Sequence, residues 1–144
     1  MEPRAFYSAF DLFPSPKGAS THIRQMAATL FEFFSGGMLY VLGDGAGSER
    51  LQEENILIYR EKFETRNYLT RALQFGSRLE DIFSTEQNPK NFKLIHFRDA
   101  WSGKIALDHC DCPSIYEVNG LPSIELQTKY LIPARTVEKI RERE

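Results

Sequence analysis

The chain has 144 residues, a formal net charge of −2, 42% hydrophobic residues and 26% charged residues, all ordinary values for one globular domain with a real core. Its basic residues do not cluster, and no apolar run approaches the roughly 20 residues that span a bilayer, so nucleic-acid binding and a transmembrane segment are both excluded. No apolar run follows the N-terminal residues Met1–Arg4 as it would in a signal peptide, and Cys110 and Cys112 are too close to form a useful disulfide. We therefore expect a cytoplasmic protein.

Short β-rich runs alternate with longer helical patterns along the chain. The predicted strands are residues 6–10, 38–42, 56–59, 94–97 and 115–118. Several are continuous apolar runs, which are typical of strands covered on both faces. The predicted helices are residues 21–34, 65–85, 102–109, 121–130 and 133–143, and residues 43–55 are expected to hold a short helical turn or an irregular excursion. This order predicts an α/β fold, a Rossmann-like open parallel sheet with right-handed crossovers and helices on both faces.

The loop between the first strand and the first helix contains two prolines followed by Lys17 and Gly18. We expect Ser20 or Thr21 to cap the helix that follows. A helix N-terminus has unpaired N–H groups and a partial positive charge, and a glycine there lets a ligand approach the backbone. The loop therefore predicts a site for an anionic or polyhydroxylated ligand.

Polar residues follow each predicted strand. Ligands of open parallel sheets bind beyond the C-terminal ends of the strands, so we expect these side chains to gather at one rim. The candidate binding residues are Lys17, Gly18, Ser20, His22, Arg98, Asp99, Asn119 and Gly120, with Asp11, Asp44, Trp101 and Glu125 beside them. Purely structural roles are also open: a turn at Gly18 and at Asn119-Gly120, an ion pair for Arg98 and Asp99, and a core position for Trp101.

Several kinds of chemistry lack their sequence signature. The chain has neither a G-x-G-x-x-G nor a P-loop motif, so classical dinucleotide and P-loop binding are not expected. The His109–Cys112 segment is too short for a zinc site and no second ligand pair completes it. No serine, histidine and acid set is indicated by spacing. We therefore expect no metal and no cofactor, and identify no catalytic residue.

Three segments together resemble a known family. Residues 10–22, 96–103 and 115–126 are similar to the first loop and to the motifs at the fourth and fifth strands of GT-B glycosyltransferases of the group 1, family 4 type. The last segment, Ile-Tyr-Glu-Val-Asn-Gly-Leu-Pro-Ser-Ile-Glu-Leu, is the most specific. The resemblance extends from about residue 5 to residue 133 and implies the N-terminal half of a GT-B fold.

What the resemblance implies is a two-domain enzyme of carbohydrate biosynthesis that transfers a sugar from a nucleotide-sugar donor to an acceptor, with retention. Residues 1–144 would be the N-terminal, acceptor-side domain, and the donor-binding domain would be absent, so we expect this chain alone to be inactive. Gly18 matches the loop glycine of the family. Asn119 lies where many relatives carry a histidine that contacts the transferred sugar, and an asparagine there favours binding over proton transfer.

Two other functions stay open. The chain would be a stand-alone flavodoxin-like binding or interaction module if it had no catalytic partner domain, or a small nucleotide- or flavin-binding enzyme, which the missing glycine motif disfavours. If a partner domain is missing, apolar rim residues Leu12, Phe13 and Leu121 should be exposed. Exposed apolar groups favour self-association, so we expect a homodimer.

Overall fold

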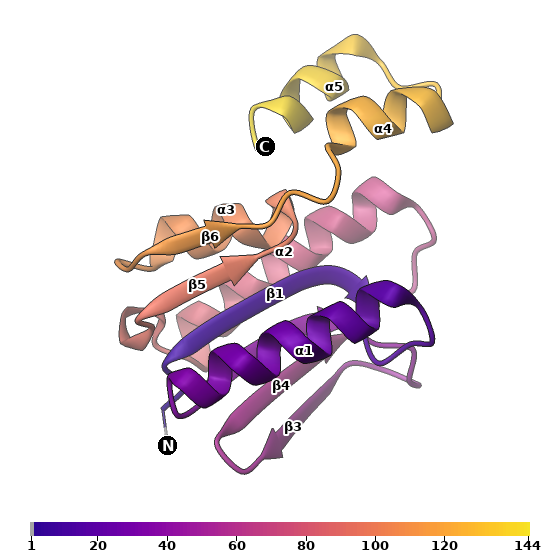
Figure 1. Ribbon diagram of the computed structural model, residues 1–144. Helices are drawn as coiled ribbons and strands as arrows, with labels where there is room; N and C mark the ends of the chain where they lie inside the picture. Colours follow the sequence, from indigo (N-terminus) through magenta and orange to yellow (C-terminus); the bar gives the residue numbers. More distant parts are fainter. Residues whose placement is uncertain (1) are drawn as a thin grey trace.

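A computed structural model describes residues 2–144 as one six-stranded sheet in the order β3-β4-β2-β1-β5-β6 (Figure 1). The strands are β1 (Ala5–Leu12), β2 (Gly37–Leu42), β3 (Glu49–Glu53), β4 (Ile56–Glu61), β5 (Leu94–Phe97) and β6 (Ser114–Tyr116). Neighbouring strands are parallel except β3 and β4. The helices are α1 (Gly18–Phe33), α2 (Tyr68–Thr85), α3 (Ala100–His109), α4 (Pro122–Lys129) and α5 (Ala134–Arg141), with a 3₁₀ turn, η1 (Pro89–Asn91).

Helices cover both faces of this sheet, as the sequence predicts. Alternate residues of β1 face opposite sides, so Phe6 joins a core cluster with α2 and α3, while Tyr7 joins a second cluster with α1. Phe75 of α2 stacks on Tyr40 of β2 with ring centroids 4.3 Å apart, and Tyr40 Oη donates a 2.6 Å hydrogen bond to the Phe75 carbonyl. Burial on both faces explains why the central strands are continuous apolar runs. The Rossmann-like α/β prediction is confirmed.

The expectation of a helical turn or irregular excursion in residues 43–55 was wrong, because this segment contains the antiparallel edge strand β3. A tight turn at Glu54, which has a φ of 53°, returns the chain to β4. In β3 only Leu51 is apolar, and it is half-buried while its four neighbours are exposed. An edge strand buries too little surface to need an apolar pattern, so periodicity gave no signal.

The predicted capping of the first helix by Ser20 or Thr21 was also wrong. The helix begins at Gly18, Lys17 occupies the N-cap position, and no side chain caps it. Ser20 is buried inside the first turn, where its Oγ accepts a 2.9 Å hydrogen bond from the Ser15 amide. The hydroxyl fixes the loop before the helix instead of capping the helix itself.

The C-terminal helices α4 and α5 lie beyond the end of the sheet where the parallel strands finish (Figure 1). They are attached through a third apolar cluster, in which Leu126 and Ile140 pack with Ala72 of α2 and Trp101 of α3. The close approach of α2 and α3 depends on Gly76, because a Cβ there would lie 3.1 Å from the Trp101 carbonyl oxygen. The contacts of Leu126 in this cluster place α4 over the C-terminal ends of the strands, where the sequence predicts the binding residues.

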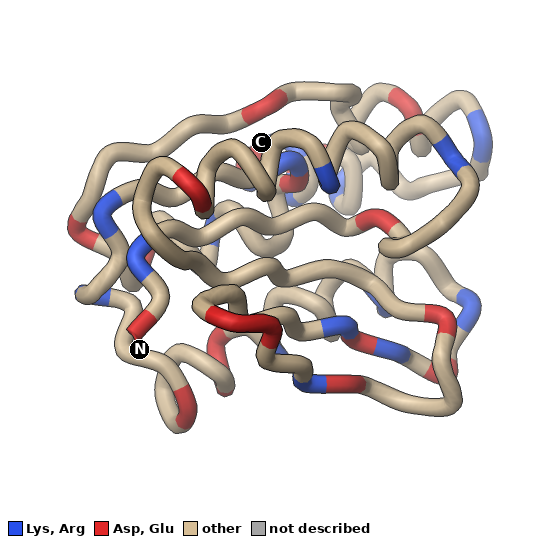
Figure 2. Tube along the Cα trace, turned by 60° about the horizontal axis from the view of Figure 1, so that its bottom comes forward, with Lys and Arg blue, Asp and Glu red and all other residues tan. Residues whose placement is uncertain are grey.

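The rim exposes less apolar surface than expected. Leu12 is 38% exposed, but Phe13 is buried in the cluster under α1, with the Arg24 guanidinium 5.6 Å from its ring centre, and Leu121 is half-buried. The expectation of an exposed Phe13 was therefore wrong. Lys and Arg are interspersed with Asp and Glu along the trace (Figure 2). No helix in residues 2–144 has the length and apolar character needed to cross a membrane.

Candidate functional site

A pocket of about 180 Å³ lies where the strand order reverses. β1 pairs with β2 on one side and with β5 on the other, so the crossovers on its two sides leave in opposite directions. Such a switch point opens a crevice beyond the C-terminal ends of the two strands. The pocket lining is Phe10, Asp11, Tyr68, Arg98, Asp99, Ala100, Trp101, Tyr116, Asn119, Gly120, Pro122 and Glu125.

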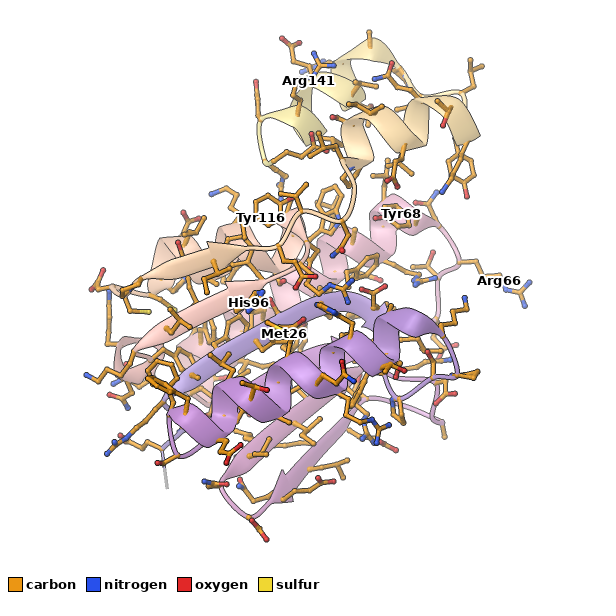
Figure 3. All side chains as sticks on the ribbon, viewed as in Figure 1. Met26, Arg66, Tyr68, His96, Tyr116 and Arg141 are labelled. Atoms are coloured by element: carbon orange, nitrogen blue, oxygen red, sulfur yellow. The ribbon has the colours of Figure 1, made fainter. Side chains whose placement is uncertain are left out.

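Four of the sequence-predicted binding residues come together in this lining: Arg98, Asp99, Asn119 and Gly120. The structure adds Tyr68 from α2 and Tyr116 from β6, which sequence reasoning missed. Both lie near the end of the sheet that faces α4 and α5 (Figure 3). The sequence could not predict that Tyr68 lines the pocket, because nothing in it indicated that the start of α2 reaches the C-terminal ends of β1 and β5.

Arg98 forms the charged base of the pocket. Its side chain is only 8% exposed, and its backbone amide donates to the Ser8 carbonyl of β1. Its Nη1 lies 3.7 Å from Asp11 Oδ2 and its Nε 3.4 Å from Glu117 Oε1, and neither nitrogen makes a hydrogen bond within residues 2–144. Arg98 is therefore compensated in charge by two carboxylates, and its Nε and Nη1 are enclosed by the protein.

Asp99 does not pair with Arg98 but caps α3. Its Oδ1 accepts a 2.7 Å hydrogen bond from the Ser102 amide, and its Oδ2 accepts a 2.7 Å bond from the Ser102 hydroxyl, which lies 2.8 Å from the Ser8 hydroxyl. Burial raises the pKa of Asp99 to about 6, and this effect outweighs the hydrogen bonds from Ser102, which lower it. The carboxylate is therefore ionised at neutral pH, although burial favours its neutral form.

Tyr68 lies in the same negative environment. Burial is the main cause that raises the pKa of its hydroxyl, and the charges of Asp99, Glu125 and Asp11 raise it further. Three carboxylates, from β1, from the N-cap of α3 and from α4, therefore act on one phenol. No basic side chain pairs with Asp99 or Glu125 within 4.0 Å among residues 2–144.

Glu117 connects the predicted His22 to the pocket, and the sequence analysis missed it. His22 Nε2 lies 2.8 Å from Glu117 Oε1, and His96 Nε2 lies 3.2 Å from Oε2. Burial raises the pKa of Glu117, but the hydrogen bond from His22 and the charges of Arg98 and both histidines outweigh it, so the net pKa is lowered. Burial lowers the pKa of His96 despite this carboxylate. The predicted strand 115–118 includes Glu117, whereas β6 ends at Tyr116 and Glu117 follows it directly.

The structure does not bring Lys17, Gly18 and Ser20 into the pocket. Ser20 is buried and serves the loop, and Lys17 is exposed at the start of α1. Gly18 is also exposed, and a Cβ placed on it would meet no atom within 4 Å. The open space at Gly18 leaves room for a ligand or a second domain. That Lys17, Gly18 and Ser20 contact such a partner stays a prediction.

Comparison with known proteins gives no assignment. No protein-family model matches the chain, and no curated protein matches it significantly. Within residues 2–144, no three His, Cys, Asp or Glu side chains group as metal ligands.

Proposed function

We propose that this chain is the acceptor-binding half of a retaining glycosyltransferase, which transfers a sugar from a nucleotide-sugar donor to an acceptor held by residues 1–144. The observation that carries the proposal is the pocket at the switch point, where Arg98, Asp99 and Asn119 converge from two segments that resemble glycosyltransferase motifs. Retention of configuration rests on that resemblance alone.

The pocket lining suits a ligand rich in hydroxyl groups. A hydroxyl both donates and accepts, so it can donate to the Asp11 or Asp99 carboxylate while it accepts from Arg98 or the Asn119 amide. The rings of Tyr68 and Trp101 supply apolar surface beside these groups. Donors, acceptors and aromatic surface together favour a sugar acceptor over an apolar ligand.

The same geometry does not favour a catalytic base in the pocket. Asp99 has both carboxylate oxygens engaged by Ser102, and Arg98 holds its charge between Asp11 and Glu117. In this proposal residues 1–144 bind and orient the acceptor. The stabilisation of the leaving diphosphate comes from a second domain that closes over the rim, next to the open space at Gly18.

The test is a transfer assay on the complete gene product that contains residues 1–144, with labelled nucleotide sugars and a broad panel of sugar acceptors. We expect transfer in at least one combination, and we expect a Glu125→Gln change in the pocket lining to raise KM for the acceptor more than KM for the donor. The absence of both transfer and nucleotide-sugar binding would refute the proposal and favour a binding module without chemistry.

A further inference from the structure

We propose that the turn between α4 and α5 binds the protein reversibly to an anionic bilayer surface. The turn comprises residues 130–133, which we call the apolar tip. It belongs to the helical unit that lies beyond the end of the sheet where the parallel strands finish (Figure 1). This role goes beyond the proposed function and does not depend on it. Three observations support it: the exposure of the tip, the cations around it and the small area that it offers to a protein partner.

The apolar tip presents large hydrophobic side chains to solvent. Leu131 is fully exposed, with a relative exposure of 105%, and the neighbouring Tyr130 is 58% exposed. Ile132 is half-buried and packs against the third apolar cluster, which attaches the turn to α2 and α3. A tyrosine beside an exposed aliphatic side chain suits the boundary of membrane and water, because its ring is buried there while its hydroxyl stays hydrated.

The tip borders an apolar groove of about 330 Å³ that carries no acidic side chain in its lining. Tyr68 and Leu69, at the start of α2, line the groove together with the tip. Arg66 is the one charged residue among the described residues of this lining, and its side chain points away from the body of the protein (Figure 3). The surface around the tip therefore offers apolar groups and a cation without a competing negative charge.

Two further cations lie next to the tip in the sequence. Lys129 precedes it directly, Arg135 follows it after one residue, and both are exposed. Within residues 2–144, no carboxylate lies within 4.0 Å of Lys129, Arg135 or Arg66. Residues 127–137 contain no acid, although the whole chain has a net charge of −2. These uncompensated cations are complementary to anionic lipid headgroups, which attract each basic residue held near the surface.

The tip offers too little area for a stable protein interface. Each partner of a standard interface buries roughly 800 Å², and two exposed side chains supply far less than that. A bilayer makes no such demand, because a protruding side chain can enter the headgroup region while cations beside it are attracted to the anionic surface. Apolar insertion and charge attraction act together, so a small tip with several cations fits a lipid surface better than a second protein.

The experiment measures cosedimentation of the 144-residue chain with lipid vesicles. Vesicles of phosphatidylcholine alone are compared with vesicles in which about a third of the lipid is phosphatidylglycerol. We expect binding to the anionic vesicles to be at least about tenfold tighter than binding to the neutral ones. The difference should shrink when the salt concentration is raised to about 0.5 M, because salt screens the attraction between the cations and the headgroups.

Three variants separate the contributions of the tip and of the cations. Leu131→Ser should weaken binding to anionic vesicles about tenfold, and Lys129→Gln about fivefold. Phe33→Ser is the matched control and should leave binding unchanged. Phe33 is 81% exposed at the end of α1, which lies at the opposite end of the sheet from α4 and α5 (Figure 1).

A fourth variant, Leu131→Trp, reports insertion of the tip directly. Trp101 is the single tryptophan of the chain and is only 2% exposed, so a change in emission on adding vesicles would come from the new side chain. We expect its emission to shift to the blue with anionic vesicles and to stay unchanged with neutral vesicles.

The proposal is overturned if the chain does not bind anionic vesicles, if it binds both kinds of vesicle equally, or if Leu131→Ser binds as well as the wild type. A concentration-dependent dimer that Leu131→Ser abolishes, without vesicle binding, would assign the tip to a second copy of the chain. None of these results bears on sugar transfer, so the proposed function stands or falls by its own assay.

Discussion

The replacement Asp99→Asn should stabilise the protein at neutral pH although it removes a charged helix cap. The side-chain oxygen of the new asparagine would accept from the Ser102 amide as Asp99 Oδ1 does now. Its amide nitrogen would donate to the Ser102 hydroxyl, which could then donate to the Ser8 hydroxyl, 2.8 Å away. The cap is preserved because asparagine is as good an N-cap residue as aspartate.

The magnitude follows from the pKa of Asp99, which burial raises to about 6 from an ordinary value of 3.8. This difference corresponds to at most about 3 kcal/mol of folding free energy, since each tenfold change in proton affinity is about 1.4 kcal/mol. The folded chain binds the proton more tightly than the unfolded chain does. The stabilisation of the wild type by the protonated Asp99 is therefore fully present below about pH 4 and is lost as the pH rises through about 6.

Urea unfolding measures this directly, with the fluorescence of Trp101 as the probe, because it is the single tryptophan and is only 2% exposed. Relative to the wild type, Asp99→Asn should gain up to about 3 kcal/mol of unfolding free energy as the pH rises from about 4 to about 7.5. Asp99→Ala is the control, which loses the cap and about 1 kcal/mol while it also removes the charge. A stability difference between the wild type and the Asp99→Asn variant that does not change with pH would refute the reasoning.

Three further variants test the packing and the charge cluster. Gly76→Ala should lower the free energy of unfolding by about 1 kcal/mol despite a better helix propensity, because its Cβ would lie 3.1 Å from the Trp101 carbonyl oxygen; an increase in urea midpoint would contradict this. Tyr40→Phe removes the hydrogen bond to the Phe75 carbonyl and should lower the free energy of unfolding by about 1 kcal/mol in the same assay; an unchanged free energy would contradict this. Glu117→Gln should lower the free energy of unfolding by about 2 kcal/mol at neutral pH. Because the pKa of Glu117 is lowered in the folded chain, this loss should shrink as the pH falls below about 4. A pH-independent loss would point to packing alone.

Much of the fold followed from the sequence because burial on both faces leaves a strong pattern. The run Met38–Leu42 had to lie inside a sheet covered by helices, and the helix patterns between strands implied parallel pairing. The edge strand β3 left no such pattern, since only Leu51 in it is partly buried. Local reasoning also misplaced the start of α1, because the Ser20 hydroxyl bonds the loop at Ser15, a contact that residue type alone does not specify.

The sequence by itself determined which residues follow the strands, and hence that Arg98, Asp99, Asn119 and Gly120 would share one rim. Only the tertiary structure decided what those groups do, because their partners come from segments far apart in the chain. Arg98 meets Asp11 and Glu117 instead of its neighbour Asp99, and Asp99 turns to cap α3. The packing of α2 and α4 at the switch point then adds Tyr68 and Glu125, and these long-range contacts set the charge of the pocket.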